Sequence, residues 1–199
     1  ALNEVCAGFQ KGYAQASRSF HYPFSAPLSQ HSQEVPLVAP AGRLLRDQIA
    51  AESGADPAKP WAVVWFHDLD MDCRLLEGLP YELFSKMDWP HARRCSADFC
   101  DLVASADVVI TKPGFGIVSD CIANRKPIVY VPRDDFHEAY LLESAIHKYC
   151  AYARIEAADL YGGNWLESLE KARQASPAHP PPPLNGAAEI ARRLAGIVL

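Results

Sequence analysis

Residues 105–142 read SADVVITKPGFGIVSDCIANRKPIVYVPRDDFHEAYLL. Two apolar runs, 107–111 and 127–131, are separated by a turn with two glycines and a helical segment at 117–124. Continuous apolar runs are typical of strands that are buried on both faces of a parallel sheet. The stretch therefore predicts a strand–helix–strand unit whose two strands lie parallel.

The same alternation continues on both sides of this unit. Further strands are predicted at 18–24, 62–66, 81–84 and 150–154. Helices are predicted at 2–17, 42–53, 96–104, 135–149, 163–175 and 187–199. Strands that alternate with helices form right-handed crossovers. We therefore predict an α/β fold: a Rossmann-like open parallel sheet with helices on both faces, and ligand-binding loops at the carboxyl ends of the strands.

Proline-rich segments interrupt this pattern. Residues 25–40 contain three prolines among polar residues and are predicted to be an extended linker. Residues 180–183 are four consecutive prolines, which predict a stiff spacer of polyproline type.

Composition excludes several classes of protein. The 199 residues include 19 Lys and Arg against 24 Asp and Glu, a net charge of −5 that argues against binding to nucleic-acid phosphates. No apolar stretch approaches the ~20 residues of a membrane span, and no signal peptide is evident. We expect a cytoplasmic protein with no integral membrane segment. Because the chain begins with Ala1, we expect it to be processed, truncated or part of something longer.

The six cysteines contain no C-x-x-C pair, and their spacing is unlike that of a zinc site. We expect mostly buried, reduced thiols and no metal.

The turn from Lys112 to Gly116 is the first candidate site. Two glycines between a strand and a helix let backbone N–H groups approach an anion, and the helix N-terminus and Lys112 add positive charge. This arrangement suits a phosphate or diphosphate. The alternative is a tight turn in which glycine is needed for a positive φ, and spacing alone favours this alternative.

Asp120 lies one turn into the helix that follows. Its carboxylate could accept hydrogen bonds from the two hydroxyls of a ribose, as acidic residues do in dinucleotide-binding folds. The alternative is that an acidic side chain in the first turn stabilises the helix dipole.

The loop after the run at 127–131 carries Arg133, His137 and Glu138. Arg133 could bind a phosphate through two parallel hydrogen bonds, and the other two could contact a sugar. The alternative is that Asp134 or Asp135 caps the next helix with Arg133 as its surface partner.

Residues 67–72 (HDLDMD) follow the run at 62–66. His67 stands at the end of that predicted strand and is a candidate substrate-binding or catalytic residue. The three aspartates lack the glycine and glutamate of an EF-hand, so a solvated acidic loop or helix start is favoured over a metal site.

The stretch 105–142 resembles the carboxyl-terminal, nucleotide-sugar-binding domain of GT-B glycosyltransferases, in particular family 28. It is also similar to the glycosyltransferase-like domain of plant arabinokinases and its bacterial relatives. The shared motifs are K-x-G-[YF]-G-x-[VI]-S-[ED], at Lys112 to Asp120, and R-x-x-F-x-E, at Arg133 to Glu138.

The resemblance implies that the chain is one half of a GT-B fold. Residues 1–33 would be the end of an amino-terminal domain plus a linker, 34–179 the nucleotide-sugar-binding domain, and 180–199 a proline spacer with a helix that crosses back. The acceptor-binding amino-terminal domain would be a missing partner.

The resemblance also implies hexosyl transfer from a nucleoside-diphosphate sugar, a UDP-sugar, without a metal or a separate cofactor. Asp120 would bind the ribose, and the sugar would meet His137 and Glu138. The diphosphate would lie on the turn Gly114-Phe115-Gly116, helped by Lys112, Ser119 and Arg133.

One feature departs from the family pattern. Relatives carry a glycine-rich loop after the first strand of this domain, whereas this chain has the acidic 67–72 loop, which is expected to repel a diphosphate.

Two alternative functions stay open beside glycosyl transfer. One is a non-catalytic, regulatory sugar-nucleotide-binding module. The other is a nucleotide-sugar epimerase or hydrolase with His67 or His137 as acid–base catalyst.

Overall fold

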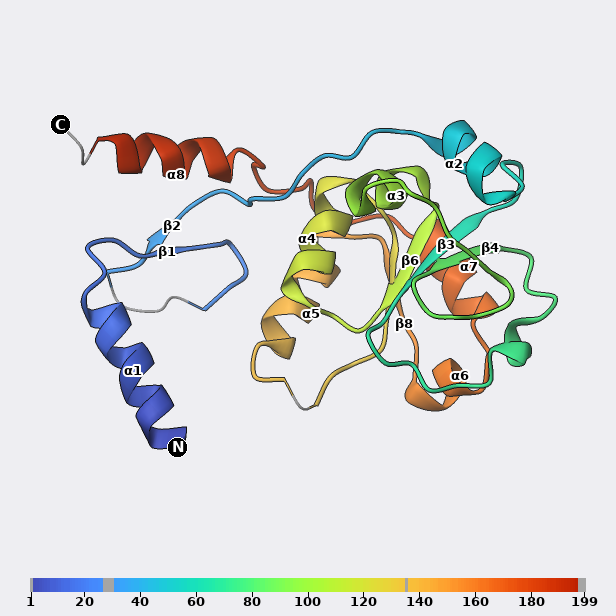
Figure 1. Ribbon diagram of the computed structural model, residues 1–199, viewed down its shortest axis with the longest axis horizontal. Coiled ribbons are helices and arrows are strands. Elements are labelled where there is room, and N and C mark those ends of the chain that lie inside the picture. Colours follow the sequence, from blue (N-terminus) through green and yellow to red (C-terminus); the bar gives the residue numbers. More distant parts are fainter. Residues whose placement is uncertain (1, 27–30, 135, 197–199) are drawn as a thin grey trace.

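The computed structural model describes residues 2–26, 31–134 and 136–196, and its centre is a six-stranded parallel sheet (Figure 1). The strands are β3 (Trp61–Trp65), β4 (Glu82–Ser85), β5 (Ala92–Arg93), β6 (Val108–Thr111), β7 (Ile128–Tyr130) and β8 (Tyr152–Arg154). Their order is β5-β4-β3-β6-β7-β8, with every neighbouring pair parallel. The predicted Rossmann-like sheet is confirmed. Of these six strands, only β5 was missed, because its two residues carry no apolar run.

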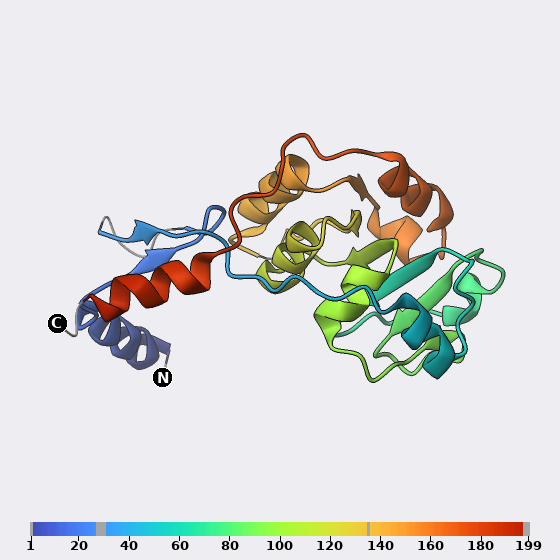
Figure 2. The ribbon, with the colours of Figure 1, turned by 90° about the horizontal axis from the view of Figure 1, so that it is seen from above.

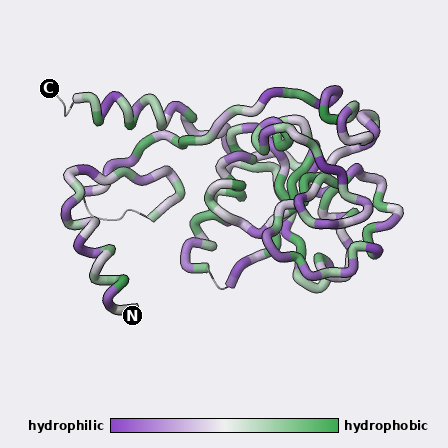
Figure 3. The backbone as a smooth tube through the Cα atoms, in the orientation of Figure 1, coloured by the Kyte–Doolittle hydropathy of each residue, from purple (hydrophilic) through white to green (hydrophobic). Residues whose placement is uncertain are grey.

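Helices cover both faces of the sheet, as predicted. Consecutive strand residues, such as Val63 and Val64, belong to two separate apolar cores, because successive side chains in a strand point to opposite faces of the sheet. The first core is covered by α2 (Arg46–Ser53), α3 (Phe99–Ser105), α4 (Phe115–Ala123) and α5 (Ala139–Tyr149). The second core is covered by η1 (Cys73–Leu76), α6 (Ala157–Tyr161) and α7 (Leu166–Gln174). Figure 3 shows hydrophobic stretches gathered in this sheet-containing body.

Four predicted helices begin later than expected: α3 and α7 by three residues, and α2 and α5 by four. The helix predicted at 42–53 begins at Arg46, because the preceding backbone lies extended against α3 and α4. The helix predicted at 135–149 begins at Ala139, since Ala139 N–H first bonds Phe136 O in a turn. Glu138, not Asp134, is the residue before this helix, and Asp135 lies outside the described residues.

A smaller unit lies to one side of the sheet body (Figures 1 and 2). It contains α1 (Leu2–Ala14), β1 (Phe20–His21), β2 (Gln33–Glu34) and α8 (Gly186–Ala195), and β1 pairs parallel with β2. The prediction that 25–40 is only a linker is wrong, because it contains β2 and the buried Val35 and Leu37. Positions 197–199 of the last predicted helix lie outside the described residues.

Two chain segments connect this unit to the body and lie side by side: the first connector, residues 35–45, and the proline spacer, residues 180–185. Leu37 N–H donates to Pro183 O at 2.9 Å, and Val38 forms an antiparallel bridge with Asn185. The proline spacer is therefore fixed to the first connector by backbone hydrogen bonds.

After this point the first connector continues as a strap, residues 40–45, along α3 and α4. Gly42 N–H donates to Asn124 Oδ1 and Arg43 N–H to Asp101 Oδ1, both at 2.7 Å. The Arg43 guanidinium also donates to Asp101 and holds the pKa of that carboxyl below its ordinary value. The strap thus pairs several of its backbone groups with side chains of α3 and with Asn124, the residue that follows α4.

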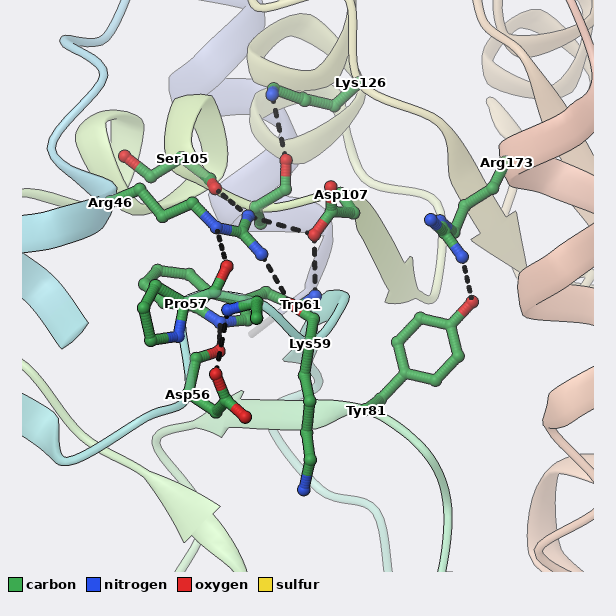
Figure 4. Close-up of polar contacts among 12 residues, drawn as sticks. Arg46, Asp56, Pro57, Lys59, Trp61, Tyr81, Ser105, Asp107, Lys126 and Arg173 are labelled. Carbon is green, nitrogen blue, oxygen red and sulfur yellow. Dashed lines mark hydrogen bonds and ion pairs between the residues drawn. The ribbon is translucent and has the colours of Figure 1, made fainter.

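A polar network closes the amino ends of β3 and β6 (Figure 4). Asp107 Oδ2 accepts from Trp61 N–H at 2.7 Å and from Arg46 Nη1 at 3.0 Å, and the Arg46 guanidinium lies 4.3 Å from the Trp61 ring centroid. These polar groups are already engaged with one another, which leaves the opposite, carboxyl edge of the sheet for a ligand.

The cysteine prediction is only partly right. All six cysteines are free, but only Cys121 and Cys150 are buried. Among the described residues, we find no helix with the length and apolar character needed to cross a bilayer.

Candidate functional site

The candidate site lies at the carboxyl ends of β3, β6 and β7. Chain order along the sheet reverses between β3 and β6, and open α/β sheets bind ligands at this kind of switch point. A cavity of about 440 Å³ opens there. It is lined by Trp65, Phe66, His67, Asp68, Thr111, Lys112, Pro113, Gly114, Phe115, Gly116, Ile117 and Arg133. The structure therefore brings together three loops that the sequence singled out separately.

The two glycines of the turn, Gly114 and Gly116, do not have a positive φ. Gly114 has φ −142°, and the positive-φ glycines of the described chain are Gly54, Gly78 and Gly163. The alternative that Gly114 or Gly116 is needed for a positive φ is therefore wrong. Packing does not require them either. A Cβ at Gly116 would meet nothing within 4 Å, and one at Gly114 only the Ile117 methyl at 3.9 Å.

The open space at Gly116 faces the amino end of α4. The first hydrogen bond of this helix runs from Val118 N–H to Gly114 O, at 3.1 Å. The amides of Phe115, Gly116 and Ile117 precede that bond, so they have no carbonyl partner within the helix. A helix of this length carries partial positive charge at its N-terminus. The cavity wall thus offers backbone donors with no side chain in front of Gly116.

Aromatic packing holds this turn in place from the smaller unit. The Phe115 ring lies 5.0 Å from the Tyr22 ring and 5.1 Å from the Phe24 ring, measured between centroids. Phe24 is buried. The side chain of Phe115 is therefore engaged in packing, which leaves its backbone amide as the group available to a ligand.

Charged side chains stand around the turn. Lys112 Nζ is 3.7 Å from Asp68 Oδ1, an ion pair between the loops after β3 and β6. The Arg133 guanidinium lies 4.5 Å from the centroid of the Phe136 ring. His67 also lines the cavity and is exposed.

Four of the predicted site residues do not line this cavity: Ser119, Asp120, His137 and Glu138. The Ser119 hydroxyl is buried and donates to Phe115 O at 2.7 Å, so it supports the helix from inside. His137 is exposed in the turn before α5, and Glu138 is the residue that precedes this helix. Their roles with a ligand stay predictions.

Asp120 is half-buried in α4, one turn beyond Gly116. Burial raises the pKa of its carboxyl, and within 2–26, 31–134 and 136–196 no cation offsets this shift. A carboxylate that is kept without a cation in a partly buried position lowers stability, and such a cost is typical of functional sites.

We expect Asp120→Asn to raise the free energy of unfolding at about pH 7, because the uncompensated charge disappears. The folded-state pKa is raised, so the destabilisation is present above that pKa. It is lost as the pH falls below the ordinary value of 3.8. Urea unfolding of both proteins across this pH range measures the effect. A gain that persists unchanged in acid would contradict the assignment.

A second cavity, of about 530 Å³, adjoins the first and shares Trp65 with it. The Trp65 and Phe99 ring centroids are 3.9 Å apart, and Lys86 Nζ lies 4.3 Å from the Trp65 ring. Arg93 and Arg94 also line it, paired with Glu82 and Asp88.

These residues could not be singled out from the sequence because they fit no motif, although Lys86 follows β4 and Arg93 and Arg94 stand at the end of β5. Their placement after adjacent parallel strands was the available signal.

The fold is similar to solved structures of glycosyltransferases. No family model matches the chain. The structure of the calicheamicin glycosyltransferase CalG4 is similar, with a TM-score of 0.53 and 15% identity over 88% of this chain and 50% of that one. The fold is that of one half of a GT-B glycosyltransferase.

Other similarities agree with this GT-B half-fold. The glycosyltransferase SsfS6 of Streptomyces sp. SF2575, in complex with thymidine diphosphate, has a TM-score of 0.50 and 18% identity over 92% of this chain and 53% of that one. The L-arabinokinase of Arabidopsis thaliana is 32% identical over 79 residues, which are 40% of this chain and 8% of that protein. The chain thus spans about half the length of the glycosyltransferases and a small part of the kinase.

Metal-binding groups do not gather here. Within 2–26, 31–134 and 136–196, no three or more His, Cys, Asp or Glu side chains are grouped as a metal site requires.

Proposed function

We propose that this chain binds the nucleoside-diphosphate sugar donor of a glycosyltransferase-like protein, with UDP as the nucleotide. The observation that carries the proposal is the pair Gly114 and Gly116. Neither backbone conformation nor packing requires glycine there, and the absence of a side chain at Gly116 leaves the amides of the first turn of α4 open to a phosphate.

In this proposal the diphosphate lies in the 440 Å³ cavity against the amides of α4. The base enters the adjoining 530 Å³ cavity beside Trp65 and Phe99. Asp120 lines neither cavity, but it lies one turn beyond Gly116 in α4, and we propose that its carboxylate accepts hydrogen bonds from the ribose. Transfer would break the bond between the anomeric carbon and the diphosphate oxygen, while the acceptor oxygen forms a new bond to that carbon and gives its proton to a general base. The helix amides, Lys112 and Arg133 would stabilise the charge on the departing diphosphate.

The acceptor and the general base would come from a second lobe. Similar glycosyltransferases are about twice as long as the matched region, since only 50% of CalG4 is covered. Val5, Phe9 and Tyr13 form an exposed apolar stripe on α1, on the smaller unit. We propose that this stripe packs against the acceptor-binding lobe.

A nucleotide titration tests the proposal. We expect the chain to bind UDP in calorimetry, with TDP, GDP and ADP as comparisons and Asp120→Ala as the variant. Loss of charge-assisted hydrogen bonds to the ribose is expected to weaken UDP binding about tenfold or more. Glu167→Ala is the matched control, because it also removes an acidic side chain but does so on α7. This variant is expected to bind UDP as the wild type does. Absence of UDP binding to the wild type would contradict the proposal.

One observation favours a second candidate, a hydrolase or epimerase that acts on the same nucleotide sugar. Of the two candidate acid–base histidines, His67 lines the diphosphate cavity and His137 does not. If His67 is catalytic, His67→Asn abolishes turnover of a UDP-sugar and leaves UDP affinity nearly unchanged. Absence of turnover by the wild type would leave donor binding as the chain's function.

A further inference from the structure

Asp68 and Lys112 meet across the switch point of the sheet. Trp65 pairs with Thr111 in the register of β3 and β6, and the Thr111 hydroxyl donates to Trp65 O at 2.6 Å. This contact fixes the two strand ends side by side. The two loops therefore leave the sheet together and place Asp68 Oδ1 3.7 Å from Lys112 Nζ.

Both side chains line the diphosphate cavity, and they differ in exposure. The Asp68 side chain is 86% exposed, whereas that of Lys112 is 38% exposed. A phosphate that approaches Lys112 therefore approaches the Asp68 carboxylate as well. Because the two charges cancel at longer range, Lys112 contributes little net attraction for a highly charged ligand.

The charge of the ligand changes during glycosyl transfer. In a sugar nucleotide the terminal phosphate is esterified. In the released nucleoside diphosphate it is free, and it gains a further negative charge near neutral pH because its second pKa is about 6. The product therefore carries more negative charge than the donor, and the additional charge lies on the phosphate furthest from the nucleoside.

We propose that Asp68 is a specificity-determining residue that disfavours free nucleoside diphosphate relative to the sugar-linked form. The inference rests on the proposed function, since it concerns the same cavity. Lys112 and the α4 amides bind the diphosphate, while Asp68 repels the charge that only the product carries. The site would thus release its product more readily than a site with Lys112 alone.

Binding of UMP, UDP and UTP to the wild type and to Asp68→Asn tests this inference without knowledge of the sugar. We expect the substitution to strengthen binding in proportion to ligand charge, by about threefold per charge for charges some 6 Å apart in water at low salt. UDP-glucose is expected to gain less than UDP. Asp70→Asn is the matched control, because it removes the same charge from the same loop but does not line the cavity.

The outcomes separate the two proposals. Equal gains for all ligands, no gain, or an equal gain in Asp70→Asn would overturn the role of Asp68 and leave donor binding standing. If neither wild type nor Asp68→Asn binds UDP, the proposed function fails and the selectivity inference fails with it.

Discussion

Gly42→Ala is expected to lower the free energy of unfolding by about 3 kcal/mol, the upper range for overpacking a close contact. A Cβ at this position would lie 2.1 Å from the carbonyl oxygen of Cys100 and 2.8 Å from the Ala104 Cβ. The first of these atoms belongs to backbone in α3, which does not move aside as a flexible side chain does. The strap would have to lift away, and the hydrogen bond from Gly42 N–H to Asn124 would be lost.

Gly12→Ala provides the matched control, because the substitution is identical and a Cβ at Gly12 meets nothing within 4 Å. Gly12 lies inside α1, where alanine is more favourable than glycine by up to about 1 kcal/mol. Urea unfolding should therefore show opposite signs for the two variants. Equal stability of Gly42→Ala and the wild type would mean that the strap is not packed as described.

Gly116→Val is expected to weaken UDP binding by about 10- to 100-fold, the equivalent of one or two charge-assisted hydrogen bonds. The valine side chain would occupy the open space in front of the α4 amides. Because that space contains no protein atom within 4 Å of the new Cβ, we expect little change in stability. Valine in a helix is not less favourable than glycine.

Calorimetry and urea unfolding of the same preparation separate the two effects. Gly116→Ala is the graded control, with a smaller side chain in the same direction and a smaller loss of affinity. Tight UDP binding by a stable Gly116→Val protein would show that no phosphate lies on this turn.

The fold could be predicted because the strands are uniform apolar runs. Val108 to Thr111 and Ile128 to Tyr130 are buried on both faces. Short apolar runs of this kind are typical of the inner strands of a parallel sheet that helices cover on both sides. The strand β5 could not be predicted, because Ala92 and Arg93 belong to the sheet only through their pairing with β4. Tertiary contact, not local pattern, creates that strand.

The candidate site could be predicted in part for a related reason. Lys112, Gly116 and Arg133 follow apolar runs directly, so parallel pairing brings them to one edge. The ion pair of Lys112 with Asp68 depends on loop geometry after β3 and could not be read from spacing. Sequence analysis expected an acidic loop that simply repels phosphate, whereas in the structure one of its carboxylates is paired with the lysine of the turn.

A crystal structure of this chain with UDP would show where the nucleotide binds. We predict that the diphosphate oxygens accept hydrogen bonds from the amides of Gly116 and Ile117, with the base beside Trp65 and the ribose near Asp120. A nucleotide bound elsewhere, or a cavity at Gly116 that stays without nucleotide at saturating UDP, would contradict the assignment of this edge of the sheet as a donor site.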